Sequence, residues 1–152
     1  MPRTKLREQP RYEFTYQFCV QSRDLSSRRH LGADAIVQLM HEAVVHLLHA
    51  LSLHEFDLGD GRTGIIAEDT IINYMREAFL FEPLAIESHV DEVSFSGFRV
   101  FHRMIRSGET IALAECGVVG FDLTGRAPVP IPETFKKALL QHHNSPQSLP
   151  HG

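Results

Sequence analysis

Reactive side chains gather between Asp24 and His30, where carboxylate, hydroxyl and imidazole groups directly precede a long apolar segment. Asp24 is a candidate nucleophile or general base, because a carboxylate can attack a carbonyl carbon or activate a water molecule. His30 is a candidate for orienting that carbonyl or water. Both residues also have a structural interpretation, since an Asp after a strand often binds backbone N–H groups of its own turn.

An amphipathic helix is predicted immediately after this loop. Apolar residues recur at spacings of three and four from Ile36 to Leu51, and no proline interrupts them. The first N–H groups of a helix lack intrahelical partners and attract negative charge. The N–H groups of Leu31, Gly32 and Ala33 are therefore candidate donors to a developing oxyanion, and Gly32 allows a ligand to approach the backbone closely.

A polar stripe opposes the apolar face of this helix and faces either water or a pocket. Its members are Asp34, Gln38, His41, Glu42 and His49. Despite the ten histidines of the chain, this stripe lacks the HExxH spacing of a zinc site. GxGxxG and GxxxxGK motifs are also missing, so the sequence gives no support for a metal, dinucleotide or P-loop phosphate site.

The composition is typical of one intracellular domain. The chain has 152 residues, of which 43% are apolar, and a formal net charge of -4. The acidic balance argues against nucleic-acid binding. No segment reads as a signal peptide or a membrane span. Cys19 and Cys116 are isolated, and we expect a reducing, cytoplasmic location.

Alternating patterns predict the strands. Residues 12–22 alternate apolar and polar side chains, and four further β-rich segments between Gly64 and Gly125 indicate an antiparallel meander. In the last of these segments, one face carries small or short side chains, which allow a helix to approach: Ala112, Ala114, Cys116 and Val118. A short helix is predicted to begin near Pro132.

The element order predicts an α+β fold in which one long helix lies across a five-stranded antiparallel sheet. We expect an N-terminal lead over residues 1–11, one domain over 12–140 and a disordered tail over 141–152. Because such a sheet exposes an edge strand, a homodimer with a continuous sheet is a reasonable expectation.

Seven short motifs support a family resemblance. They are Asp24-Leu25-Ser26, Arg29-His30-Leu31, Glu42-Ala43, Asn73-Tyr74, Glu82-Pro83-Leu84, Phe98-Arg99-Val100-Phe101-His102 and Ile131-Pro132-Glu133. In this order, over residues 12–140, the chain resembles the hotdog-fold thioesterases, specifically the 4-hydroxybenzoyl-CoA thioesterase-like group of acyl-CoA thioesterases.

The resemblance implies a hotdog fold, with the sheet wrapped around the central helix. It also implies hydrolysis of an acyl-CoA or acyl-carrier thioester by a homodimer or dimer of dimers. Coenzyme A would enter as part of the substrate, and no cofactor, nucleic acid or membrane partner is expected. Arg99 and Arg103 share a strand face and could reach coenzyme A phosphates, although a solvated face also explains them.

The family's usual nucleophile or general base is the second Asp of an Asp-x-Asp motif. Without gaps this position falls on Ser26, whereas a loop two residues longer places Asp24 there. The glycine that precedes the histidine in the family is replaced by Arg29, and His41 stands where the family has its helix glutamate.

We assign Asp24 and His30 to catalysis. The predicted substrate-binding residues are Ser26, Leu31, Gly32, Ala33, Asp34 and Glu42. The alternative is a non-hydrolytic acyl-thioester-binding protein of the same fold, which the serine at the usual acid position favours. A hotdog-fold dehydratase would need a His and an acid in a motif that the sequence does not contain.

Overall fold

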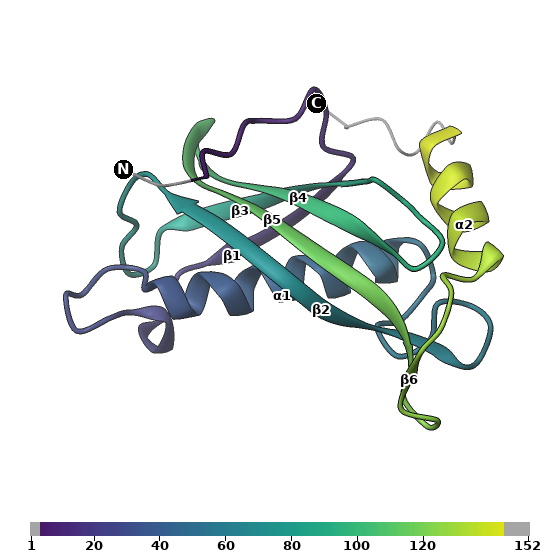
Figure 1. The fold of residues 1–152 in the computed structure, drawn as a ribbon. Coiled ribbons are helices and arrows are strands. Elements are labelled where there is room, and N and C mark those ends of the chain that lie inside the picture. The colour runs from purple at the N-terminus through teal and green to yellow at the C-terminus, as the bar shows by residue number, and fades with distance from the viewer. Residues whose placement is uncertain (1–3, 145–152) are drawn as a thin grey trace.

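Helix α1 (Ala33–Ala50) lies against one face of a curved antiparallel sheet, as Figure 1 shows. The computed structural model describes residues 4–144. The elements follow in the order β1 (Phe14–Cys19), η1 (Ser22–Asp24), α1, β2 (Thr63–Tyr74), β3 (Pro83–Asp91), β4 (Gly97–Arg106), β5 (Glu109–Asp122), β6 (Ala127–Pro128) and α2 (Glu133–Asn144).

The sheet has the strand order β1-β3-β4-β5-β2, with β6 paired to β5. The predicted hotdog architecture of five strands around a central helix is confirmed, and the short strand β6 is added to it. The predicted meander is correct for β3, β4 and β5 but wrong for β2, which pairs with β5 instead of β3. The reason is that β1 occupies the other edge of β3.

Helix α1 begins and ends where its sequence periodicity predicts. Gly32 is the N-cap with φ -82° and ψ 155°, an extended conformation. The apolar side of the helix is buried against the sheet through Ala35, Ile36, Met40, Ala43, Val44, Leu47 and Leu48. Each of the larger side chains contributes roughly 1.5–3 kcal/mol when fully buried. The predicted polar stripe lies on the exposed side.

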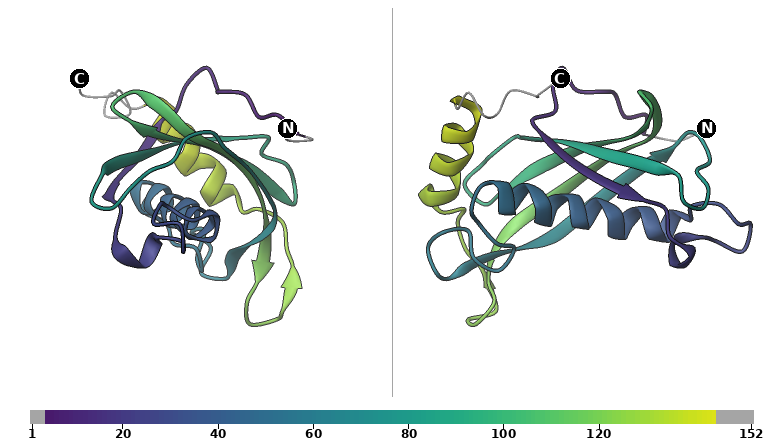
Figure 2. Two further views of the ribbon diagram at one scale, coloured as in Figure 1. Left: turned by 90° about the vertical axis from the view of Figure 1, so that its left-hand side faces the viewer. Right: turned by 180° about the vertical axis from the view of Figure 1, so that it is seen from behind.

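The small side chains of β5 let α1 approach the sheet. Ala112 and Ala114 are buried in one cluster with Ile36, Met40 and Ala43 of the helix. Figure 2 shows the sheet curving around the helix as a result.

Helix α2 covers one end of the sheet beside the end of α1 (Figures 1 and 2). Phe135 is fully buried there, and its ring stacks on Phe98 with 4.5 Å between centroids. The helix continues to Asn144, past the expected start of a disordered tail at residue 141. The rest of that expected tail lies outside the described residues.

The N-terminal lead crosses the sheet face opposite α1. The N–H of Leu6 donates to Asn73 Oδ1 at 2.7 Å, and Asn73 Nδ2 donates to the carbonyl of Thr4 at 3.0 Å. The Arg103 guanidinium lies 4.6 Å from the centre of the Tyr12 ring. Within residues 4–144, neither helix combines the length and apolar character needed to span a bilayer.

Candidate active site

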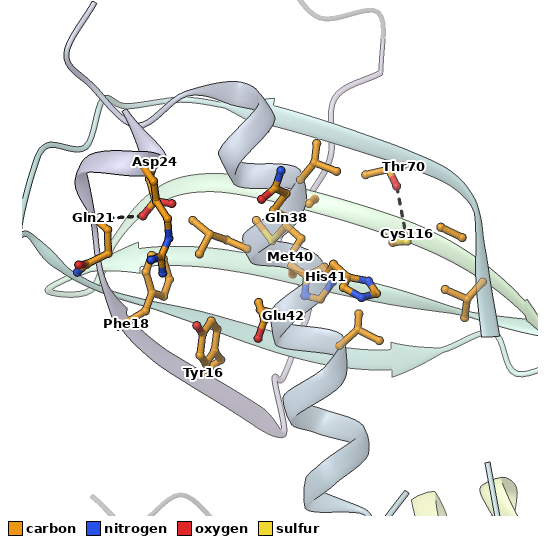
Figure 3. Close-up of a pocket in the computed structure, with 18 of the residues that line it drawn as sticks. Tyr16, Phe18, Gln21, Asp24, Gln38, Met40, His41, Glu42, Thr70 and Cys116 are labelled. Atoms are coloured by element: carbon orange, nitrogen blue, oxygen red, sulfur yellow. Dashed lines mark hydrogen bonds between the residues drawn. The ribbon is translucent and has the colours of Figure 1, made fainter. Parts of the chain in front are cut away.

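A cavity of about 730 Å³ lies between α1, the sheet and the loop that follows β1. Figure 3 shows Asp24, Gln21 and Phe18 on one side of α1, and Thr70 and Cys116 on the other. The volume falls within the range of about 300–1,000 Å³ that is usual for small-molecule sites. Much of the wall is apolar, and the polar groups on it can fix the orientation of a ligand.

Asp24 lines this cavity and is held by backbone contacts. Its carboxylate Oδ2 accepts the N–H of Gln21 at 2.8 Å, and its carbonyl accepts the N–H of Gly32 at 3.0 Å. Within residues 4–144, Oδ1 receives no hydrogen bond. Asp24 therefore presents a fixed carboxylate with one oxygen free for chemistry.

Glu42 lines the same cavity from α1. Burial raises the pKa of the Tyr16 phenol, and the nearby Glu42 and Asp24 charges raise it further. The negative charges of both carboxylates thus raise the pKa of the same phenol. Figure 3 shows Tyr16 beside Glu42. The polar stripe of α1, which the sequence assigned to either water or a pocket, contributes Gln38, His41 and Glu42 to the cavity wall.

Ser26 and His30 lie beside the cavity and do not line it. The Ser26 hydroxyl accepts the N–H of Arg28 at 3.2 Å, which is the contact of a turn residue. The His30 Nδ1 lies 3.0 Å from the carbonyl oxygen of Leu31, and its ring meets Tyr74 edge-on. The catalytic role of His30 and the binding role of Ser26 stay predictions.

The loop keeps a glycine-type backbone where the family has its glycine. Arg29 has φ 63°, the left-handed conformation that glycine adopts without strain. The loop thus has a left-handed residue at this position although the residue is arginine. The exchange places a cation on the exposed surface of the loop.

The end of the loop and the first residues of α1 also lie outside the cavity wall: Leu31, Gly32, Ala33 and Asp34. The N–H of Leu31 donates to the carbonyl of Ala78 at 2.8 Å, and that of Gly32 donates to Asp24. In the described part of the chain, the N–H groups of Ala33 and Asp34 have no hydrogen-bond acceptor. Of the predicted donors, Ala33 is therefore available to an oxyanion, and Asp34 adds a second N–H.

The arginines on the sheet have ion-pair partners, whereas the arginine at the cavity has none within residues 4–144. Arg99 and Arg103 are engaged by carboxylates, with Arg99 bound to Asp69 and Glu115 and Arg103 to Glu87. Arg23 lines the cavity and has no ion pair among residues 4–144. Arg23 was not predicted from the sequence, although its position beside Asp24 was a usable signal.

His102 of β4 also lines the cavity and was not singled out from the sequence. A signal existed, because His102 alternates in phase with the apolar residues Phe98, Val100 and Met104. All four side chains are buried on the face toward α1.

Cys116 lines the cavity as a free thiol. Burial raises its pKa, and the Thr70 hydroxyl lies 3.6 Å from its sulfur. Because the thiolate is the nucleophilic form, a thiol with a raised pKa is a poor nucleophile. No group of three or more His, Cys, Asp or Glu side chains within residues 4–144 is arranged to hold a metal ion.

Solved structures share this fold at low sequence identity. A 1,4-dihydroxy-2-naphthoyl-CoA thioesterase from Synechocystis has a TM-score of 0.75 at 20% identity over 84% of this chain and 95% of that one. A gentisyl-coenzyme A thioesterase has a TM-score of 0.74 at 22% identity over 82% and 98%. A Staphylococcus aureus protein in complex with CoA has a TM-score of 0.74 at 14% identity over 91% and 92%.

A search of curated protein sequences gave no significant match. The family comparison is decisive, since the model of the thioesterase-like superfamily matches residues 20–139. With its hotdog fold and its cavity beside the central helix, the chain belongs to the thioesterase-like superfamily.

Proposed function

We propose that the protein hydrolyses an acyl thioester of coenzyme A or of an acyl carrier, with Asp24 as the catalytic carboxylate. One observation carries this proposal: the fixed Asp24 carboxylate lies on the wall of a largely apolar cavity of about 730 Å³. An acyl chain in the cavity would bring its thioester carbonyl to this carboxylate. Membership of the thioesterase-like superfamily supports the reaction class.

In the simplest step, Asp24 Oδ1 accepts a proton from a water molecule as the water oxygen attacks the thioester carbon. The carbonyl oxygen becomes an oxyanion, for which the N–H groups of Ala33 and Asp34 are the proposed donors, provided that the carbonyl projects past the cavity wall to the N-terminus of α1. Collapse of this intermediate breaks the C–S bond and releases the thiolate, which takes up a proton. Direct attack by the carboxylate, followed by hydrolysis of the anhydride, gives the same products.

The loop of residues 23–30 supplies cations for the coenzyme. Arg23 lines the cavity, and Arg28 and Arg29 are exposed in the same loop. None of these three has an ion pair in the part of the chain that the structure describes. Arginine binds phosphate oxygens in a bidentate manner, so this loop suits the phosphates of coenzyme A better than Arg99 and Arg103 do.

We also propose that the active form is a homodimer joined through β2. This strand forms an edge of the sheet, and its residues 66–70 are exposed. Ile66 of β2 is 40% exposed and Val37 of α1 is 47% exposed. A second copy paired along this edge would cover both side chains and close the cavity. Exposed edge strands are generally paired or covered in this way.

The free thiols of Cys19 and Cys116 support a reducing, cytoplasmic location.

Release of free thiol from short, long and aromatic acyl-CoAs tests the proposed reaction. Asp24→Asn is expected to lower kcat by at least about 100-fold, the usual contribution of a general base. Asp91→Asn is the matched control, because Asp91 lies at the end of β3 and does not line the cavity. Unchanged turnover in Asp24→Asn would remove Asp24 from the mechanism.

A non-hydrolytic acyl-thioester-binding protein is the second candidate. The observation that favours it is the position of Ser26, which stands at the usual acid position and uses its hydroxyl in a turn. This function predicts that acyl-CoA binds in calorimetry while no substrate in the panel releases thiol.

A further inference from the structure

One polar pair interrupts the apolar sheet face that packs against α1. The hydroxyl oxygen of Ser88 on β3 lies 2.7 Å from Nδ1 of His102 on β4. Each residue is only 1% exposed. The other imidazole nitrogen, Nε2, is buried and has no hydrogen-bond partner among the residues that the structure describes. A buried polar atom without a partner costs roughly 1–3 kcal/mol, so it calls for an explanation.

The Ser88 hydroxyl determines which nitrogen of His102 carries the proton. Nδ1 of His102 is the hydroxyl's one recorded partner within residues 4–144. If the hydroxyl donates to Nδ1, its proton is satisfied and Nε2 carries the ring N–H. The opposite tautomer would leave both the hydroxyl proton and the Nε2 lone pair unsatisfied in the core. We therefore assign the tautomer in which Nε2 is a donor.

The Nε2–H of His102 lies on the edge of the ring away from Ser88. The two nitrogens of an imidazole ring point in roughly opposite directions, and Nδ1 faces Ser88 on β3. Nε2 is therefore directed away from β3, toward β5, where the residue paired with His102 is Ala114. Ala114 presents only a methyl group beside the ring, and both His102 and Ala114 line the cavity.

This donor lies far from Asp24. Ser88, level with His102, pairs with Phe14 at the start of β1, whereas Asp24 follows the end of that strand. The six residues of β1 span on the order of 15 Å at about 3.4 Å per residue. We therefore place the two residues at different parts of the cavity, with His102 away from the thioester carbonyl that reacts at Asp24.

We propose that His102 is a specificity-determining residue whose Nε2–H donates a hydrogen bond to an uncharged oxygen, hydroxyl or carbonyl, carried by the acyl group at a distance from the thioester. This rests on the thioesterase function proposed above, which fixes the reacting end of the substrate at Asp24. Burial lowers the pKa of His102 to about 3, so the ring is neutral at physiological pH. A neutral donor in an apolar cavity suits a neutral oxygen.

Paired substrates of equal length test this assignment. Wild type is expected to hydrolyse ω-hydroxydodecanoyl-CoA with a kcat/KM about tenfold above that for dodecanoyl-CoA, the value of one well-formed hydrogen bond. The corresponding octanoyl pair is too short to reach His102 and should show no preference. The preference should disappear in Ser88→Ala/His102→Leu, which removes the whole polar pair without leaving a hydroxyl unpaired.

Two further variants separate recognition from packing. His102→Gln retains an N–H near the position of Nε2 and should keep part of the preference. Met104→Leu changes a buried residue of the same strand that does not line the cavity, so it should keep the full preference. Unfolding curves of all variants show whether each is folded.

Calorimetric binding of the free acids gives a readout that does not need turnover. Tighter binding of ω-hydroxydodecanoic acid than of dodecanoic acid, lost in the double variant, would uphold recognition by His102 even if no thioester were cleaved. Equal kcat/KM and equal affinity for both members of the long pair would overturn it. The function proposed above would survive that result, provided that dodecanoyl-CoA is hydrolysed.

Discussion

The carbonyl oxygen of Asp24 accepts a hydrogen bond from the N–H of Gly32 at 3.0 Å, so the candidate catalytic residue is tied to the N-cap of α1. This hydrogen bond fixes the position of Asp24 relative to the free N–H groups of Ala33 and Asp34 at the start of α1. A change of side chain at Asp24 leaves this backbone link intact.

Asp24→Asn should therefore lose turnover without losing stability. Asparagine keeps an oxygen that can accept the N–H of Gln21, so the free energy of unfolding should change by less than about 1 kcal/mol. Asp24→Ala removes this acceptor and should cost about 1 kcal/mol, as loss of a capping side chain does. Urea unfolding of the three proteins measures the difference. If Asp24→Asn is as unstable as Asp24→Ala, its loss of activity cannot be assigned to catalysis.

Ile66→Lys should convert the proposed dimer into monomers and reduce thioester hydrolysis with it. A lysine ammonium cannot be buried between two β2 strands without a partner. Val93→Lys is the control, since Val93 is 37% exposed, close to the 40% of Ile66, and lies in the turn between β3 and β4. Sedimentation velocity of both variants gives the mass in solution. A dimeric Ile66→Lys protein would show that β2 is not the contact.

Phe135→Ala should lower the free energy of unfolding by about 3–5 kcal/mol, because it empties a fully buried aromatic site against Phe98. Leu140→Ala on the same helix should cost less than about 0.5 kcal/mol, since Leu140 is 60% exposed. Denaturant unfolding measures both values. Equal effects would mean that α2 does not pack as the structure shows.

Stability should fall in mild acid partly through His102. Burial lowers the pKa of His102 to about 3 in the folded protein, whereas an exposed histidine has a pKa near 6.5. Between these values the unfolded chain binds a proton that the folded chain does not, so stability declines as the pH falls through this window. One such group contributes at most about 1.4 kcal/mol per pH unit.

His102→Gln should reduce that slope between pH 6.5 and 3, a window set by the pKa near 6.5 of an exposed histidine and the value of about 3 in the fold. Unfolding free energies of wild type and variant across the window provide the measurement. Parallel curves would indicate that His102 gains its proton in the fold as readily as in the unfolded chain.

Local patterns in the sequence predicted the local elements well. The periodicity from Ile36 to Leu51 predicted α1, and the small residues of β5 predicted the strand face that packs on it. The pairing of β2 with β5 was missed, because strand pairing depends on contacts distant in sequence and β1 competes for the edge of β3. The residue composition of the strands does not show whether β1 or β2 pairs with β3.

The candidate site was only partly predictable for a similar reason. Asp24 and Glu42 meet at one cavity although 18 positions separate them in the sequence. Ser26 and His30 were selected by motif; their polar atoms contact the backbone of their own loop, and their roles stay predictions. The alternation of β4 placed His102 on the apolar face of the strand. That its Nε2 lacks a hydrogen-bond partner among the described residues is known only from the structure.

The N-terminal lead makes the two faces of the sheet inequivalent. One face holds α1, and Thr4, Leu6 and Tyr12 already occupy part of the other through Asn73 and Arg103. Two dimers stacking sheet against sheet would have to displace this segment or bury it between them. In such an assembly the lead would act as a spacer, and shortening it is expected to change how many copies assemble.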